Sequence, residues 1–137
     1  MDVQFLGGAG EVGRSAILVN DRLLLDYGVQ SATPMQYPVG DVAPEAVVVS
    51  HGHLDHAGAV PTLLSGDRRP EIHWTPPTAA LTRTLARDTL KLHGGTMQCP
   101  FTQTHVARLG EVECRHGYRE SFEAAGHEIT FYDAGHI

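Results

Sequence analysis

Residues 51–56 read His-Gly-His-Leu-Asp-His, so three histidines and one aspartate lie within six consecutive positions. Neutral imidazole nitrogens and carboxylate oxygens are ligands that zinc prefers in proteins. The cluster directly follows residues 46–50, an apolar and β-branched run that is typical of a buried strand. We therefore expect a metal-binding loop at the C-terminal tip of a strand.

The spacing within the cluster divides its side chains between two points in space. His51 and His53 are two positions apart, and side chains two apart in an extended segment project to the same side. Both can therefore reach one ion, whereas the adjacent Asp55 and His56 face a second point nearby. The spacing leaves two arrangements open. Either two metal ions bind, or one ion binds and Asp55 or His56 acts as a hydrogen-bonding partner or base.

The six-residue cluster resembles the metal-binding motif of the metallo-β-lactamase superfamily. Further segments resemble the β-CASP nuclease branch of that superfamily, in the expected order along the chain. Residues 11–15, Glu-Val-Gly-Arg-Ser, and 135–137, Gly-His-Ile, are similar to ribonuclease J-like and archaeal cleavage-and-polyadenylation-factor-like enzymes. The other matching segments are 5–10, 23–28, 56–61, 75–78 and 131–134.

The resemblance implies an α+β fold that forms the N-terminal half of an αββα sandwich. The order of the expected elements, hairpins first and then strands mixed with helices, also favours α+β over a doubly wound fold. We expect residues 1–137 to be a partial metallo-β-lactamase domain. The second half of the sandwich, with a further acidic ligand and a last histidine, and the β-CASP domain would then lie outside this sequence.

The resemblance also assigns roles within the site. His136 would join His51 and His53 around the first metal, and Asp55 and His56 would hold part of the second. Asp55 is the candidate catalytic residue, because it is placed to orient the attacking hydroxide. The cofactors implied for the complete protein are two zinc ions, which would activate water for attack on phosphorus.

Three other residues are candidates for a hydrogen bond to a metal-binding histidine or for contact with substrate. Asp26 ends an expected strand and could accept a hydrogen bond from a ligating histidine, as carboxylates do around metal sites. It could equally be an ordinary acid of a strand-end turn. Glu11 and Arg14 lie in a glycine-rich loop and could contact substrate or only shape that loop.

Residues 8–13 also match the G-x-G-x-x-G pattern of dinucleotide-binding proteins. That pattern requires a helix after its glycines. Here two short β-rich arms follow, and Asn20-Asp21 between them is favourable chemistry for a hairpin turn. We therefore expect a hairpin, with the glycines forming a tight loop near the metal site.

The function implied by the resemblance is zinc-dependent hydrolysis of RNA phosphodiesters, either 5′ exonucleolytic or at 3′ ends, within a longer protein. We expect the 137-residue chain alone to be inactive or nearly so. Two alternatives remain open: a hydrolase of a small thioester or lactam on the same fold, and a non-catalytic subunit of an RNA-processing complex. RNA is the expected partner of the complete protein, and a homodimer is one assembly to test.

The composition limits these possibilities. The net charge is −6 with histidine neutral, whereas nucleic-acid-binding surfaces are usually basic. Positive charge must then come from bound metals or from sequence outside these residues. No apolar run is long enough to span a membrane. We expect no targeting segment, and we expect Cys99 and Cys114 to be thiols in a reducing cytoplasm.

The remaining pattern predicts the elements that must position the site. Thr75-Pro76 is typical of a helix start, and Gly94-Gly95 would end that helix, with Leu81, Leu85 and Leu92 on its inner face. We interpret its basic stripe and the scattered histidines as surface or structural features. The stripe consists of Arg83, Arg87 and Lys91, and the histidines are His73, His93, His105, His116 and His127. Further helices and strands are expected at 61–64, 71–74, 101–109, near 116–122 and at 128–133.

Overall fold

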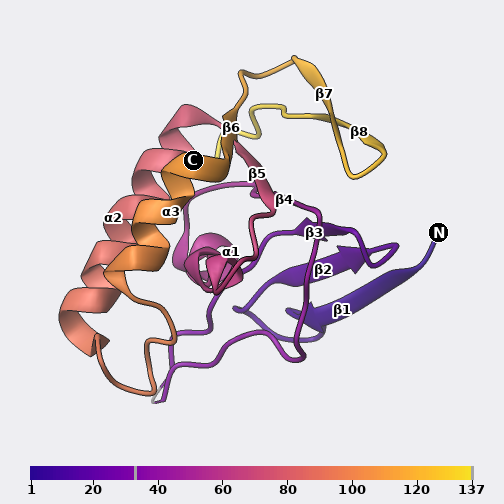
Figure 1. Ribbon diagram of the computed structural model, residues 1–137. Coiled ribbons are helices and arrows are strands. Elements are labelled where there is room, and N and C mark those ends of the chain that lie inside the picture. Colours follow the sequence, from indigo (N-terminus) through magenta and orange to yellow (C-terminus); the bar gives the residue numbers. More distant parts are fainter. Residues whose placement is uncertain (33, 137) are drawn as a thin grey trace.

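The computed structural model describes residues 1–32 and 34–136. Its centre is a six-stranded sheet in the order β1-β2-β3-β4-β5-β6. Strands β1 to β3 are antiparallel, and β3 to β6 run parallel. Helices and strands are mixed along the chain, which confirms the α+β prediction (Figure 1). The sheet strands are β1 (Val3–Gly7), β2 (Ala16–Val19), β3 (Leu23–Leu25), β4 (Ala46–Val48), β5 (Glu71–Trp74) and β6 (Glu113–Arg115).

The glycine-rich loop leads into a hairpin, as its sequence predicted. β2 and β3 pair antiparallel, with Val19 opposite Leu23. Asn20 and Asp21 between them have φ angles of 51° and 57°, the left-handed values that a type I′ turn requires. No helix follows the glycines, so the pyrophosphate-binding element of a dinucleotide site is missing here. The glycines that match G-x-G-x-x-G therefore belong to a tight loop before a hairpin and not to a dinucleotide-binding site.

The parallel half of the sheet brings two chain segments to one edge. Leu25 at the end of β3 lies opposite Val48 at the end of β4. Because the two strands are parallel, the residues that follow them leave the sheet on the same side. Strand β4 ends at Val48, two residues earlier than the apolar run suggested. The amide of Val49 still donates to the His73 carbonyl of β5 at 3.0 Å, so the chain leaves the sheet only after residue 49.

Helices cover one face of the sheet. α2 (Pro76–His93) and α3 (Gln103–Val112) lie side by side on one flank of the molecule (Figure 1). α1 (Leu54–Ala57) contacts α2, and the 3-10 helix η1 (Val60–Leu64) contacts α3. The core between helices and sheet is apolar, and its largest fully buried side chains include Trp74, Phe101, Leu24, Leu64, Ile72 and Leu109. No helix in the described part of the chain is both long and apolar enough to cross a bilayer.

The buried face of α2 differs from the leucine face that the sequence predicted. Leu92 is 74% exposed, and Leu81 and Leu85 are only partly buried. Small side chains fill the inner face instead, because they let the helix backbone approach the sheet closely, whereas leucines are accommodated at its margins. Of the basic stripe, Arg87 and Lys91 are exposed, in keeping with the surface interpretation, whereas Arg83 is partly buried and forms an ion pair with Glu113. The buried residues of α2 are Thr78, Ala79, Thr82, Ala86 and Thr89.

A separate hairpin, β7 (Ser121–Ala124) and β8 (His127–Thr130), packs on the opposite face of the sheet. The strand expected near 116–122 is therefore wrongly placed, since β6 ends at Arg115 and β7 begins at Ser121. The ring of Phe122 stacks on His116 at a centroid distance of 3.6 Å and an interplanar angle of 5°. His116 in turn hydrogen-bonds to buried His73, so both histidines are structural, as expected.

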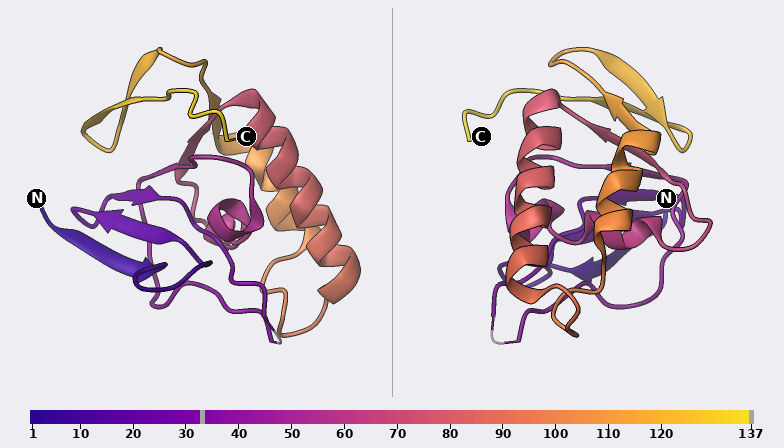
Figure 2. Two further views of the ribbon diagram at one scale, coloured as in Figure 1. Left: turned by 180° about the vertical axis from the view of Figure 1, so that it is seen from behind. Right: turned by 60° about the vertical axis from the view of Figure 1, so that its left-hand side comes forward.

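The sheet face that carries this hairpin is only partly covered. Ile17, Leu25 and Val48 share that face and are half-buried or buried. Val3 and Phe5 on β1 are 45% and 58% exposed. The chain after β8 runs back from the hairpin and comes to lie near one end of α2 (Figure 2). A hollow of about 580 Å³ lies between the sheet and this returning segment.

Candidate metal centre

The six-residue cluster is split between an extended segment and the first turn of a helix. His51 and His53 lie before α1, and His53 is the N-cap of that helix with extended φ and ψ angles of −78° and 149°. Asp55 and His56 lie within α1, which the sequence pattern did not predict. The helical turn gives the second pair a different direction from the first, so the local backbone itself separates the candidate ligands into two groups.

The neighbouring backbone holds this loop firmly. Ser15 donates its amide proton to the Asp55 carbonyl at 3.0 Å. Tyr27 donates to the carbonyl of His56 at 2.9 Å, and Val29 to that of Leu54 at 3.0 Å. The segment after β3 and the start of β2 therefore satisfy carbonyls of a short helix that could not persist alone. These backbone contacts fix the positions of Asp55 and His56, whose side chains carry the candidate metal-binding atoms.

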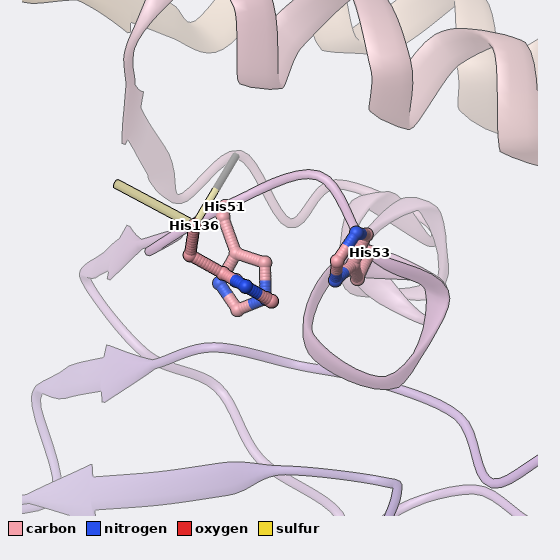
Figure 3. A group of neighbouring side chains, drawn as sticks. All are labelled: His51, His53 and His136. Atoms are coloured by element: carbon pink, nitrogen blue, oxygen red, sulfur yellow. The ribbon is translucent and has the colours of Figure 1, made fainter. Parts of the chain in front are cut away.

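His51, His53 and His136 form a nearly equilateral triangle of imidazole rings (Figure 3). The centroid of His51 lies 4.9 Å from those of both His53 and His136, which are 4.8 Å from one another. One donor atom from each residue lies within 4.8 Å of the others. A tetrahedral zinc ion with nitrogens at about 2.0–2.1 Å would space such centroids about 5 Å apart. The triangle therefore has the dimensions of a three-histidine site.

A second group of potential ligands adjoins the first. His51, Asp55 and His56 also offer donor atoms within 4.8 Å of one another. Nε2 of His56 lies 3.7 Å from Oδ2 of Asp55, and the ring centroids of His51 and His56 are 4.1 Å apart. His51 belongs to both groups, whereas the spacing had placed it in the first alone. The two groups are therefore adjacent and share one edge.

Asp26 lies behind the second group. His56 donates its Nδ1 proton to Oδ2 of Asp26 at 2.8 Å, and the backbone amide of Ser50 donates to Oδ1 at 2.7 Å. The hydrogen bond to Asp26 raises the pKa of His56 against the opposing effect of burial. Of the two interpretations of Asp26, the contact with His56 supports a hydrogen-bonding partner of a ligating histidine. The Asp26 backbone is left-handed, with φ of 60°, a conformation that aspartate tolerates.

Residues 9–126 match the model of the Metallo-beta-lactamase superfamily. The chain belongs to that superfamily. The six-stranded sheet with its helices is consistent with half of the metallo-beta-lactamase fold. Members bind divalent metal ions, and the two groups of histidine and aspartate side chains fit such binding.

Relatives within the superfamily match nearly the whole chain. The present chain is 36% identical to an RNase aCSPSF2 of Saccharolobus solfataricus, and the match covers 98% of the present chain. It is 35% identical to an RNase J-like protein of Methanocaldococcus jannaschii, and this match also covers 98% of the present chain. Transcription termination factor FttA of Methanosarcina mazei is 35% identical, also over 98%. The resemblance to the β-CASP nuclease branch is confirmed. The chain spans 28%, 31% and 23% of the lengths of these three relatives.

His136 reaches the metallo-beta-lactamase site from a distant part of the chain. It follows β8 by six residues, and Gly135, with φ of 72°, reverses the backbone just before it. The amide of Gly135 donates to Oδ1 of Asp133 at 2.9 Å, so Asp133 acts as a turn residue. His136 is exposed. The last residue of the Gly-His-Ile segment, Ile137, lies outside the described residues.

Glu11 and Arg14 bind each other rather than pointing into the two ligand groups. Nε of Arg14 donates to Oε1 of Glu11 at 2.6 Å, and this hydrogen bond lowers the pKa of Glu11. Nη1 of Arg14 also donates to the carbonyl oxygen of Tyr37 at 3.2 Å. The pair therefore ties the glycine-rich loop to the segment that follows β3. Contact of either residue with substrate stays a prediction.

Electrostatics within the first group favour neutral imidazole. Burial lowers the pKa of His51, and the nearby imidazoles of His56, His53 and His136 lower it further, against the opposite effect of Asp26. A neutral ring keeps a lone pair free for a cation. Ser50, which the sequence pattern did not predict as a site residue, lies between β4 and His51 and contacts both Asp26 and His51. The available signal was its place directly before the first histidine of the cluster.

Proposed function

We propose that the complete protein is a zinc-dependent phosphodiester hydrolase that cleaves RNA. The observation that carries this proposal is the convergence of two adjacent ligand groups, one centred on His51, His53 and His136 and the other on His51, Asp55 and His56. Three relatives that match almost all of the chain support the choice of substrate, because two are named RNases and the third is named a transcription termination factor.

The donor set fits zinc. It consists of imidazole nitrogens and a carboxylate, which zinc accepts, with no thiolate among the groups. We assign His51, His53 and His136 to one zinc ion, and Asp55 and His56 to part of a second. Paired zinc ions would supply Lewis acidity for attack on a phosphodiester. Ligands still needed by the second ion would come from sequence outside these 137 residues.

The protein's own residues have distinct tasks in this proposal. Asp26 holds the Nδ1 proton of His56, so that Nε2 faces Asp55. Asp55 is the catalytic residue, because its carboxylate is partly exposed beside both groups and can orient a water molecule. The exposed position of His136 lets substrate approach from that side of the site.

The domain organisation belongs to the same proposal. Residues 1–137 form a partial metallo-beta-lactamase domain, and a second sheet would cover the apolar face on which Val3 and Phe5 are exposed. The net charge of −6 gives this part no general affinity for RNA. We therefore place the basic RNA-binding surface in a β-CASP domain outside these residues. The described structure shows Cys99 and Cys114 as free thiols, which favours a cytoplasmic location.

Two competing functions are less well supported. A hydrolase of small thioesters or lactams would use the same ligands, but the names of the matching relatives favour RNA. A non-catalytic subunit would be expected to lack ligands, yet all four residues of the cluster, His51, His53, Asp55 and His56, are present. Whether the protein acts as a homodimer is tested separately by sedimentation.

The test uses the complete gene product. Elemental analysis should find two zinc ions per chain, and end-labelled RNA should be cleaved, with the product pattern separating 5′ exonucleolytic from internal cutting. His53→Ala should abolish cleavage, whereas His127→Ala, on the β7–β8 hairpin, should retain it. The 137-residue chain should show little or no hydrolysis. Zinc-replete protein that hydrolyses a thioester or lactam but leaves RNA intact would refute the proposal.

A further inference from the structure

We infer that Ser50 is a positioning residue whose hydroxyl group fixes the tautomer of His51, leaving Nε2 of that ring as the metal-binding nitrogen. This inference rests on the proposed metal site and extends it to a residue outside both ligand groups. Ser50 offers no ligand atom itself. It acts through two hydrogen bonds made by one hydroxyl oxygen.

The hydroxyl of Ser50 lies between a carboxylate and an imidazole. Its Oγ is 2.8 Å from Oδ2 of Asp26 and 2.9 Å from Nδ1 of His51. The backbone amide of Ser50 separately donates to Oδ1 of Asp26 at 2.7 Å. Asp26 therefore holds Ser50 at two points, and one of them does not depend on the side chain. Removing the hydroxyl should leave the residue in place.

The order of protons along this chain follows from what each group can donate. An ionised carboxylate only accepts hydrogen bonds, and a serine hydroxyl has one proton. The contact with Asp26 therefore requires Ser50 to donate its proton to Oδ2. The serine oxygen is then an acceptor toward His51, so Nδ1 of His51 must carry the proton of the neutral ring. The lone pair of that ring lies on Nε2.

The reverse arrangement is unfavourable. If Nδ1 of His51 carried the lone pair, Ser50 would have to donate to it. Two oxygens, Oγ of Ser50 and Oδ2 of Asp26, would then face each other at 2.8 Å without a proton between them. Losing a hydrogen bond to the charged carboxylate, and bringing two oxygen lone pairs together, costs more than a neutral hydrogen bond contributes. The carboxylate therefore dictates the tautomer of His51 through the serine.

The same carboxylate oxygen controls both ligand groups. Oδ2 of Asp26 accepts from Ser50 Oγ and from Nδ1 of His56, in each case at 2.8 Å. His56 is fixed directly, and His51 is fixed through Ser50. Histidine ligands commonly donate their second ring proton to a carboxylate or similar acceptor, which orients the ring and raises its affinity for metal. Here one carboxylate provides this contact for two histidines.

The first test measures zinc affinity in the complete gene product. Ser50→Ala should weaken zinc binding roughly 10- to 100-fold, as loss of an outer hydrogen-bonding partner typically does. Ser50→Thr keeps the hydroxyl and should restore affinity close to that of the unmodified protein. Ser65→Ala is a matched control, because Ser65 is an exposed serine whose hydroxyl bonds a backbone carbonyl outside the two ligand groups. Far-UV circular dichroism spectra of the metal-free proteins should coincide, which would show that the fold is unchanged.

The second test reads the tautomer itself. In metal-free protein labelled with ¹⁵N-histidine, at a pH where His51 is neutral, its ring shifts should report a proton on Nδ1. Ser50→Ala should shift the ring toward a mixture of tautomers, and Ser50→Thr should not. If the unmodified protein fails to bind zinc, the proposed function fails. If it binds zinc and Ser50→Ala changes neither affinity nor tautomer, the inference about Ser50 is wrong.

Discussion

Gly28 and Asp55 are in direct backbone contact, so that a Cβ atom added to Gly28 would lie 1.7 Å from the carbonyl oxygen of Asp55. The same atom would lie 2.6 Å from the amide nitrogen of His56. These atoms belong to the backbone peptide that joins Asp55 and His56, so no side chain could move aside to make room. The absence of a side chain at residue 28 therefore allows the segment that follows β3 to approach the backbone of residues 55–56 closely.

Gly28→Ala should displace α1 and the ligands that it carries. We expect the free energy of unfolding to fall by about 1–3 kcal/mol, the usual cost of an added carbon in a packed region. Zinc binding should weaken as well, because Asp55 and His56 move with the loop. Chemical denaturation and zinc titration measure the two effects. Gly110→Ala, in α3 with no atom closer than 4.0 Å, should instead be neutral or stabilising by up to about 1 kcal/mol.

Glu113→Gln should make the fold less stable at neutral pH. Burial works to raise the pKa of Glu113, but hydrogen bonds from Arg83 and Arg115 outweigh it and lower the pKa to about 2. Together with Trp74, these contacts join α2, β5 and β6. Loss of the charged acceptor should cost about 2 kcal/mol at pH 7.

The pH dependence of that difference has a defined sign. A depressed carboxyl pKa stabilises the folded state above its unfolded value, here 4.5, and this contribution disappears as pH falls through about 2. Denaturant midpoints of the unmodified protein and Glu113→Gln should therefore converge between pH 4.5 and 2. Glu111→Gln, whose ion pair with Arg69 is exposed, should shift stability by less than about 1 kcal/mol. An unchanged gap at pH 2 would contradict this account.

Phe122→Ala should loosen the hairpin that precedes His136. The Phe122 ring stacks on His116 and lies 5.4 Å from Phe131 in the segment leading to the site. Removing it should lower stability by about 2 kcal/mol and also weaken zinc binding, because the position of His136 depends on this segment. Glu123→Ala changes an exposed neighbour on the same strand and should affect neither measurement. Equal zinc affinity in both variants would show that the hairpin does not hold His136.

Thr82→Val should stabilise the protein. Thr82 is 1% exposed, and within the described residues its hydroxyl has no hydrogen-bonding partner. Valine has nearly the same shape, so the change removes a buried unpaired polar group, which should raise the free energy of unfolding by about 1 kcal/mol. Thr89→Val provides the contrast, because the Thr89 hydroxyl donates to the Leu85 carbonyl at 3.0 Å and its loss should bring no gain. Thermal melts distinguish the two.

Local patterns predicted the parts of this structure that depend on local interactions. The turn at Asn20-Asp21, the strand at 71–74 and the helix at 76–93 all lie where their turn, propensity and capping signals placed them. The prediction of which face of α2 is buried was wrong, because it relied on hydropathy, which ranks leucine above threonine and alanine. Because α2 packs close to the sheet, small threonine and alanine side chains are buried in place of leucines. No pattern within the sequence of the helix indicates how far the sheet lies from it.

The sequence by itself determined which residues could bind metal, since His51, His53, Asp55 and His56 lie within six positions and their order is typical of one superfamily. The family resemblance also named His136, 80 residues after His56, but only the tertiary structure brings its ring to those of His51 and His53. It also placed Asp26 against His56, and Ser50 between Asp26 and His51. These contacts depend on the parallel register of β3 and β4 and on the packing of the β7–β8 hairpin. Both are set by interactions between distant segments.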